Sequence, residues 1–364
     1  MPTIGVSRQS CRTVRLSGYV AGLVIWASPL PAETIDASFQ SPDLDRWMYP
    51  FNSSPGYRPE ASVFSAVGQE NDFPPFSFDQ RDGQFMVGFD TATQIPAGRG
   101  PCGYRVTSAT LTLTVSRDGA FEYDPTYDDW GTYAMLPDSD LGRPVECYGA
   151  AFRNGWQSCT TPEAFPCFYE GTSTNPGPPF GPSASSDVRN VYPTDFAGGE
   201  ARDVSNNVRD QFDPVPFAIG RNAALSSGAA VPVETELSFE LEVTNADVQA
   251  FLSSALNEGR LRIVVTSLQP ASSDGGPGTG QFAAFFTKEA GIPMFAPRLS
   301  LDVMLIPAGD ANDDGQVTFT DVTTTLANWN ASGAPGLTGD ADCSGTVDFN
   351  DILTELANFG VGIP

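Results

Sequence analysis

The C-terminal segment of this 364-residue chain repeats itself with a period of 30 residues. One copy, GDANDDGQVTFTDVTTTLANW, begins at Gly309, and the other, GDADCSGTVDFNDILTELANF, begins at Gly339. Eleven of these 21 positions are identical, whereas unrelated segments would share about one. A repeat this short has little core of its own, so the two copies are expected to pack together as one small module.

Each copy carries oxygen-bearing side chains at the spacing of a twelve-residue calcium loop. Such a loop needs oxygens at positions 1, 3, 5, 7, 9 and 12, because a hard cation takes six or seven oxygen ligands at about 2.4 Å. Gly315 and Gly345 occupy position 6, where the chain must turn sharply. The predicted ligands of two Ca²⁺ ions, with position 7 contributing its backbone carbonyl, are Asp310, Asn312, Asp314, Gln316, Thr318, Asp321, Asp340, Asp342, Ser344, Thr346, Asp348 and Asp351.

Apolar residues at helical spacing follow each loop. They recur at i, i+3, i+7 and i+10, and they are Phe319, Val322, Leu326 and Trp329, then Phe349, Ile352, Leu356 and Phe359. This spacing predicts two short helices whose apolar stripes face each other as a small core. The phenylalanine at loop position 10 is either core or contact surface, and the spacing favours core. Val317 and Val347, at position 8, are expected to face inward and link the loops.

A loop followed by a helix, twice, with Asp at position 12 and no entering helix, resembles a type I dockerin over residues 307–364. The resemblance implies a module that docks to a cohesin-like protein partner. Two family features differ here: the recognition pair at positions 10 and 11, commonly Ser-Thr, and a Lys-Arg pair on the helix. The residues at these places are Phe319-Thr320, Phe349-Asn350, Thr325 and Glu355. Seven of the predicted ligands are carboxylates, which would repel one another without a cation, so calcium binding and folding of the tail should be coupled.

Residues 33–306 consist mostly of short segments with alternating or continuous apolar residues, separated by glycine and proline. The predicted strands are 85–89, 106–115, 235–243, 261–268, 282–286 and 299–306. Two helices are predicted, at 245–256 and 203–212, and an irregular insertion spans about 119–230. We therefore expect a mainly β chain: an antiparallel β-sandwich or jelly roll with short helices, followed by a small α-helical calcium module.

Several body segments resemble DNRLRE-type domains, which are extracellular β-sandwiches. They are FMVGFDTATQIPAG with YRVTSATLTLTV, ARDVSNNVRDQF, LRIVVTSL and FFTKEAGIPMFAPRLSLDV. Thr287 replaces the usual serine of the SKE turn, and the cysteine-bearing insertion is extra. The layout also resembles exported proteins of planctomycete-type bacteria. The resemblance implies a fold and an extracellular address and does not imply a reaction.

The charge balance and the missing histidine exclude several functions. With 44 acidic and 19 basic residues the net charge is −25, which argues against nucleic acid and anionic membranes. The chain has no histidine, and Lys288 is its only lysine. Catalytic triads and histidine-ligated metals are therefore excluded, and a hydrolase would need carboxylates or a tyrosine. We expect no enzymatic activity.

The N-terminus is typical of a secretory signal. Arg8, Arg12 and Arg15 precede the apolar segment 16–25, which is shorter than the roughly 20 residues of a membrane span. With cleavage at Ala32, residues 1–32 are predicted to be a signal peptide. The mature chain is expected in the extracellular space or cell envelope, with no transmembrane segment.

The cysteines support an oxidising compartment. An even set in the body, namely Cys102, Cys147, Cys159 and Cys167, allows three pairings. Our favoured pairs are Cys159 with Cys167 and Cys102 with Cys147, which leaves Cys343 odd. Free thiols are the less favoured alternative.

The leading functional hypothesis is a non-catalytic attachment protein whose tail docks to a protein partner. A carbohydrate-binding accessory protein in polysaccharide degradation is one alternative, because segment 121–133 combines five aromatic with four acidic residues. The explanation of these rings as core is the favoured one. The second alternative is a carboxylate-based glycoside hydrolase, for which Asp124, Asp128 or Asp129 would be candidates.

Overall fold

The computed structural model describes residues 33–49, 56–66, 79–134, 140–153, 155–158, 167–168, 190–271, 282–333 and 335–362. The predicted signal peptide at 1–32 lies outside them. The strands are β1 Thr34–Phe39, β2 Leu44–Met48, β3 Glu60–Ser65, β4 Arg81–Asp90, β5 Tyr104–Thr114, β6 Val145–Phe152, β7 Gln157–Ser158, β8 Cys167–Phe168, β9 Val191–Ala197, β10 Glu200–Asp203, β11 Ala218–Ile219, β12 Glu236–Glu240, β13 Arg260–Ser267, β14 Ala283–Phe286 and β15 Arg298–Leu305. The α-helices are α1 Trp130–Ala134, α2 Ala246–Glu258, α3 Phe319–Ala327 and α4 Phe349–Ala357.

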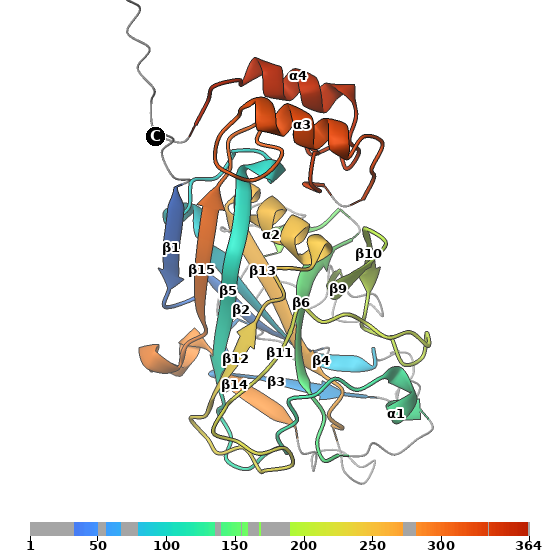
Figure 1. Ribbon diagram of the computed structural model, residues 1–364. Coiled ribbons are helices and arrows are strands. Elements are labelled where there is room, and N and C mark those ends of the chain that lie inside the picture. The colour runs from blue at the N-terminus through green and yellow to red at the C-terminus, as the bar shows by residue number, and fades with distance from the viewer. Residues whose placement is uncertain are drawn as a thin grey trace, which may run out of the picture.

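Two antiparallel sheets form most of the body (Figure 1). One sheet has four strands in the order β1-β15-β5-β12. The other has nine, with the path β10-β9-β6-β13-β4-β3-β14 and with β11 and β2 pairing beside β6 and β4. In addition, β7 and β8 pair in parallel as a separate two-stranded sheet. The predicted mainly β, antiparallel fold is confirmed for the described residues. None of the helices in the described part of the chain is both long enough and apolar enough to cross a membrane.

The main core lies between the two sheets. Leu111 and Leu113 of β5 belong to the same buried cluster as Val87 of β4 and Ile263 of β13. The neighbouring residues along these strands point to the other face of the nine-stranded sheet, where Met86 and Val264 belong to a second buried cluster. The nine-stranded sheet is thus buried on both faces, which explains the continuous apolar run FMVGF in β4.

The predicted strands overlap β4, β5, β12, β13, β14 and β15, with one change of phase. Strict alternation places Val106 on the face opposite to Leu111, yet both are buried. The reason is a bulge: Asp302 pairs with Ser108 and Val303 pairs with Val106, so Thr107 is an extra residue in β5. One inserted residue returns the strand to the same face.

One predicted helix is confirmed and the other is wrong. Helix α2 begins after Asn245, whose side chain accepts from the backbone N–H of Asp247 and Val248, and it ends at Gly259 in the left-handed region with φ of 76°. Asp203 instead ends β10, and residues 205–211 form successive turns. Asn207 accepts a bond from Arg81 Nε at 3.1 Å, and such asparagine bonds compete with a helix.

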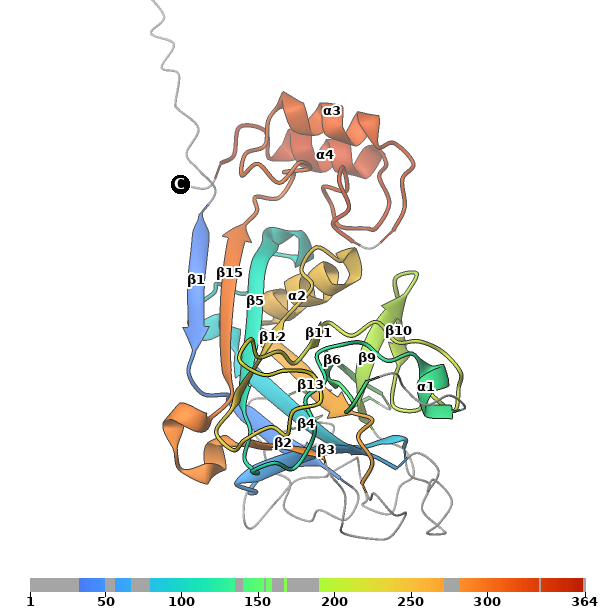
Figure 2. The same ribbon diagram turned by 60° about the horizontal axis from the view of Figure 1, so that its bottom comes forward.

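The tail lies beyond one end of the sheets. Helices α3 and α4 lie side by side at the extremity of the molecule, and their loops approach the body near the start of β5 and the helix α2 (Figures 1 and 2). The loops therefore lie between the two helices and the β-body.

Candidate calcium sites

The first loop wraps its backbone around two buried carboxylates. Asp310, at position 1, accepts backbone N–H groups from Asp314 at 3.1 Å and Gly315 at 2.6 Å. Asp321, at position 12, accepts from Ala311 at 3.0 Å and Thr318 at 2.7 Å. The loop is thereby closed between its first and last positions. Asp321 also completes a capping box with Thr318 at the start of α3.

The second loop repeats this arrangement. Asp340 accepts from Ser344 and Gly345, each at 3.0 Å, and Asp351 accepts from Asp342 at 3.0 Å and Asp348 at 2.7 Å. One carboxylate oxygen from each of Asp340, Asp342 and Asp351 lies within 4.8 Å of the others. Sequence spacing alone predicted this convergence, because all three positions belong to one loop.

The remaining predicted ligands lie on the same loops. Asn312 and Asp314 are bonded to each other at 3.1 Å in the first loop, and the Ser344 hydroxyl lies 3.0 Å from the Thr346 carbonyl in the second. Thr318 and Asp348, at position 9, act as N-caps of α3 and α4. Gln316 occupies position 7 of the first loop, where its backbone N–H donates to Asp314 at 3.0 Å. In both loops, every atom that the predicted ligands would offer to a metal is an oxygen. Oxygen ligands suit a hard cation such as Ca²⁺.

Burial disfavours the charged form of three of the loop carboxyls. It raises the pKa of Asp310 to about 7 and raises those of Asp340 and Asp351 above their ordinary range. Gathered carboxylates that resist ionisation are favourable partners for a divalent cation, since the cation removes both the desolvation penalty and the mutual repulsion.

The position-8 valines are buried, as expected, and each bonds through its backbone to the other repeat. Val317 exchanges backbone bonds with Val361 and Gly360 after α4, at 2.9 and 2.8 Å. Val347 pairs in the same way with Ala331, after α3. Each loop is therefore held by the chain that leaves the other repeat, so neither repeat is complete alone.

The two apolar helix stripes do not form a core, and that prediction is wrong. Phe319 is 68% exposed and Phe349 is 60% exposed. The other exposed apolar residues of the tail are Leu326, Trp329, Leu353, Leu356, Phe359 and Val361. We call these eight residues the outer apolar face. The helices meet through polar groups instead: Thr325 donates to Glu355, and both are fully buried.

The position-12 aspartates explain this orientation. Asp321 and Asp351 are fully buried because they turn toward their own loops. Residues one turn later, Thr325 and Glu355, lie on the same helix face and meet between the helices. The helix face that carries the position-12 aspartates is consequently the inner one, and the apolar stripe is left outside.

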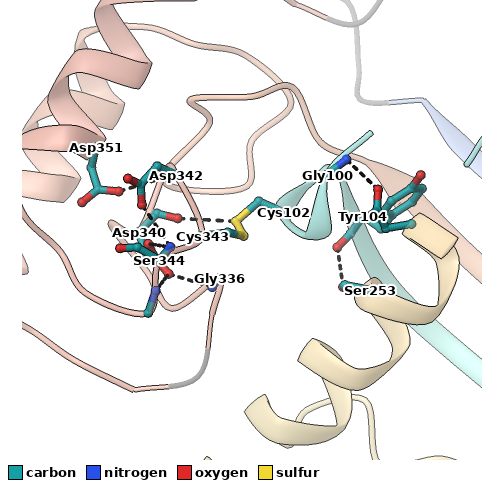
Figure 3. The surroundings of a disulfide bond; sticks show 12 residues. Gly100, Cys102, Tyr104, Ser253, Gly336, Asp340, Asp342, Cys343, Ser344 and Asp351 are labelled. Atoms are coloured by element: carbon teal, nitrogen blue, oxygen red, sulfur yellow. Dashed lines mark hydrogen bonds between the residues drawn. A yellow bond between two sulfur atoms is a disulfide. The ribbon is translucent and has the colours of Figure 1, made fainter. Parts of the chain in front are cut away.

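Position 4 of each loop contacts the body. Cys343 forms a disulfide with Cys102, which lies just before β5 (Figure 3). Asp313, its counterpart in the first loop, pairs with Arg105 of β5. Both loop residues have positive φ, 60° and 59°. Two equivalent residues thus attach the two loops to one short segment of the body.

The predicted Cys102–Cys147 pair is therefore wrong. Cys147 is a free cysteine in the middle of β6, fully buried in the main core, whereas Cys102 lies at the end of the body that meets the tail. The Cys159–Cys167 pair lies outside the described residues, because Cys159 is not among them. The predicted pairing left Cys343 without a partner, and this unpaired cysteine was the one feature of the sequence that could have indicated the observed bond.

The aromatic segment 121–133 divides between core and surface. Phe121 and Tyr123 are buried in the main core, which agrees with the structural explanation of these rings. Tyr127 is exposed, and its hydroxyl lies 3.3 Å from Asp213. Asp124 and Asp128 are buried, and Asp128 pairs with Arg143 at 2.9 Å. Asp129 is exposed and accepts from the backbone of Thr132.

Comparison with protein-family models gave no matching family, and comparison with curated proteins gave no matching relative.

Proposed function

We propose that this chain is a secreted, non-catalytic attachment protein whose dockerin-like tail binds two Ca²⁺ ions and docks to a protein partner. The observation that carries the proposal is the outer apolar face. Three pairs of large side chains, 30 residues apart, are exposed at equivalent places on α3 and α4: Phe319 with Phe349, Leu326 with Leu356, and Trp329 with Phe359.

Exposure of these apolar side chains to water is unfavourable in free energy. Contiguous exposed apolar side chains are uncommon on monomeric proteins and mark interaction sites. The disulfide and the Asp313–Arg105 pair hold the loops toward the body, so the helices face away from it. Calcium would order the loops from which both helices start, and would thereby shape the docking face. The expected partner is a cohesin-like protein of the cell envelope that covers this apolar face.

Retention of the full chain on the envelope fraction of the source cell tests this function. We expect retention in calcium and release in EDTA. The double variant Leu326→Asp with Leu356→Asp should abolish retention, because it places two charges on the outer apolar face. Val215→Asp is the matched control: Val215 is 50% exposed and lies on the body, whereas Leu326 is 54% exposed. Retention that survives both EDTA and the double variant would refute tail-mediated docking.

A second candidate function is glycan binding by the body, and the exposed ring of Tyr127 beside Asp213 supports it. Aromatic faces stack on sugars while carboxylates accept hydroxyl hydrogen bonds. Tyr127→Ala with Trp130→Ala should then reduce retention on polysaccharide columns in EDTA as well as in calcium. Unchanged retention would remove this candidate.

A further inference from the structure

Lys288, the chain's only lysine, lies against two carboxyl groups of the body. Its Nζ atom is 3.5 Å from Oδ1 of Asp45 and 4.0 Å from Oε1 of Glu289. Asp45 belongs to β2, whereas Lys288 and Glu289 belong to the short 3-10 turn that follows β14. The fold thus gathers an amine and two acids from segments 243 residues apart.

The surrounding backbone orients the amine and the acid for reaction. The backbone N–H of Lys288 donates to Oδ2 of Asp45 at 2.6 Å, and this bond polarises the carboxyl group. The Nζ atom donates to the backbone carbonyl of Asp43 at 2.9 Å. One oxygen of Asp45 is therefore held by an N–H group, and the other faces the amine at 3.5 Å, so the carboxyl group lies beside the nucleophile.

Burial makes the charged form of this cluster expensive. The side chain of Asp45 is fully buried, and those of Lys288 and Glu289 are 24% and 21% exposed. Asp45 lies on the same face of β2 as Trp47, which packs against the main core. Burial, with the charge of Asp45, raises the pKa of Glu289 to about 8, so this carboxyl can hold a proton at neutral pH. A desolvated amine is also a better nucleophile.

We propose that Lys288 and Asp45 form an intramolecular isopeptide bond, with Glu289 as the proton relay. The Lys288 ammonium first passes one proton to the carboxylate of Asp45, and the neutral Nζ then attacks Cγ, so that a C–N bond forms. Glu289 protonates the departing oxygen and takes the proton lost by nitrogen, so it ends as it began. One water molecule leaves, and an uncharged amide replaces a buried ion pair. No oxidant, metal or other co-reactant is needed.

The bond joins the beginning of the β-body to the turn just before its last strand, β15. A covalent bond there would keep the two ends of the body connected when a pulling force is applied to the tail. The proposal is independent of the calcium module, because none of the three residues lies in residues 307–364.

The mass of the denatured full-length mature chain tests the bond directly. After reduction and alkylation, the chain should be lighter than its sequence by one water molecule. An amine-reactive reagent should label the α-amino group and leave Lys288 unlabelled, and proteolysis should give a branched peptide that contains Asp45 and Lys288. The full sequence mass with a labelled Lys288 would overturn the proposal and identify the cluster as an ordinary ion pair.

Variants separate chemistry from a structural role. Lys288→Arg retains the positive charge and should show no water loss. Asp45→Asn should lose ammonia in place of water, an outcome that a purely structural role would not give. Glu289→Gln should keep the full sequence mass, and water loss at the wild-type rate in this variant would refute the proton relay. Glu60→Gln, in the nearby Glu60–Arg117 pair, is the matched control and should still lose water.

Discussion

Cys102 and Cys343 are joined by a disulfide that ties the body to the fourth residue of the second tail loop, 241 residues further along the chain. A bond that closes so long a segment restricts the unfolded chain strongly, and we expect Cys343→Ser to lower the free energy of unfolding by about 2–5 kcal/mol. The Arg105–Asp313 pair cannot compensate, because exposed ion pairs contribute about 1 kcal/mol or less.

Urea unfolding followed by circular dichroism measures this effect. The variant should have a lower midpoint than the wild type without reductant, and the two midpoints should converge when reductant is added. Equal midpoints under oxidising conditions would show that the bond does not stabilise the folded chain.

The loop carboxylates at position 12 should each control one calcium ion. Asp351→Asn keeps the side-chain volume but removes a charge from the second loop, so the calcium stoichiometry measured by titration calorimetry should fall from two to one. Asp321→Asn should have the same effect on the first loop, and the double variant should bind none. If either single variant still binds two ions with wild-type affinity, that aspartate is not a ligand.

Gly345 and Gly360 allow a matched test of loop geometry. Both have left-handed backbones, with φ of 80° and 81°, so an alanine costs about 1–2 kcal/mol at either place. A Cβ at Gly345 would also lie 2.8 Å from the carbonyl oxygen of Gly333, whereas the space around Gly360 is open. Gly345→Ala should therefore destabilise the calcium-bound tail more, as measured by its thermal midpoint. Equal losses would indicate that the loop shifts to accept the methyl group.

A buried ion pair in the body should be expensive to break. Arg81 and Glu146 pair with side chains 1% and 2% exposed, and burial raises the pKa of Glu146. Glu146→Gln leaves the Arg81 charge without its counter-ion and should cost about 3–5 kcal/mol in urea unfolding. The same change in the partly exposed Glu60–Arg117 pair, Glu60→Gln, should cost less than about 1 kcal/mol. Similar costs at the two sites would contradict this account.

Cys147 should be chemically silent in the folded chain. Burial raises the pKa of its thiol, and the thiolate is the reactive form. Iodoacetamide at pH 8 should leave the peptide that contains Cys147 unmodified until a denaturant unfolds the body, as peptide mass spectrometry would show. Rapid modification of the native protein would place this thiol outside the core.

Local patterns were sufficient wherever the interacting groups are close in sequence. Asp340, Asp342 and Asp351 converge because a twelve-residue loop brings its own positions together. Helix α2 was predictable from Asn245 and Gly259, which cap its two ends by local bonds. Strand β5 was predicted in position but not in phase, since the bulge at Thr107 depends on its pairing with β15.

The spacing of apolar residues could not predict which face of α3 and α4 is buried. An apolar stripe ordinarily faces a core, but in this tail the buried face belongs to Asp321 and Thr325 and to their counterparts in the second repeat. Backbone N–H groups of the loops donate to the buried carboxylates of Asp321 and Asp351 and offset the cost of their burial, and a helical pattern does not describe these bonds. The outer apolar face therefore became visible only in three dimensions.

The sequence by itself determined the repeat, the gathering of oxygen-bearing side chains in each loop and the antiparallel β character of the body, because these depend on residues within one loop or one strand. The tertiary structure alone decided that Cys343 bonds to Cys102, that Cys147 stays buried, that the helices turn their apolar side outward, and that Lys288 meets Asp45. Each of these depends on residues far apart in the chain, and their meeting is set by the packing of whole sheets and by the attachment of the tail to the body.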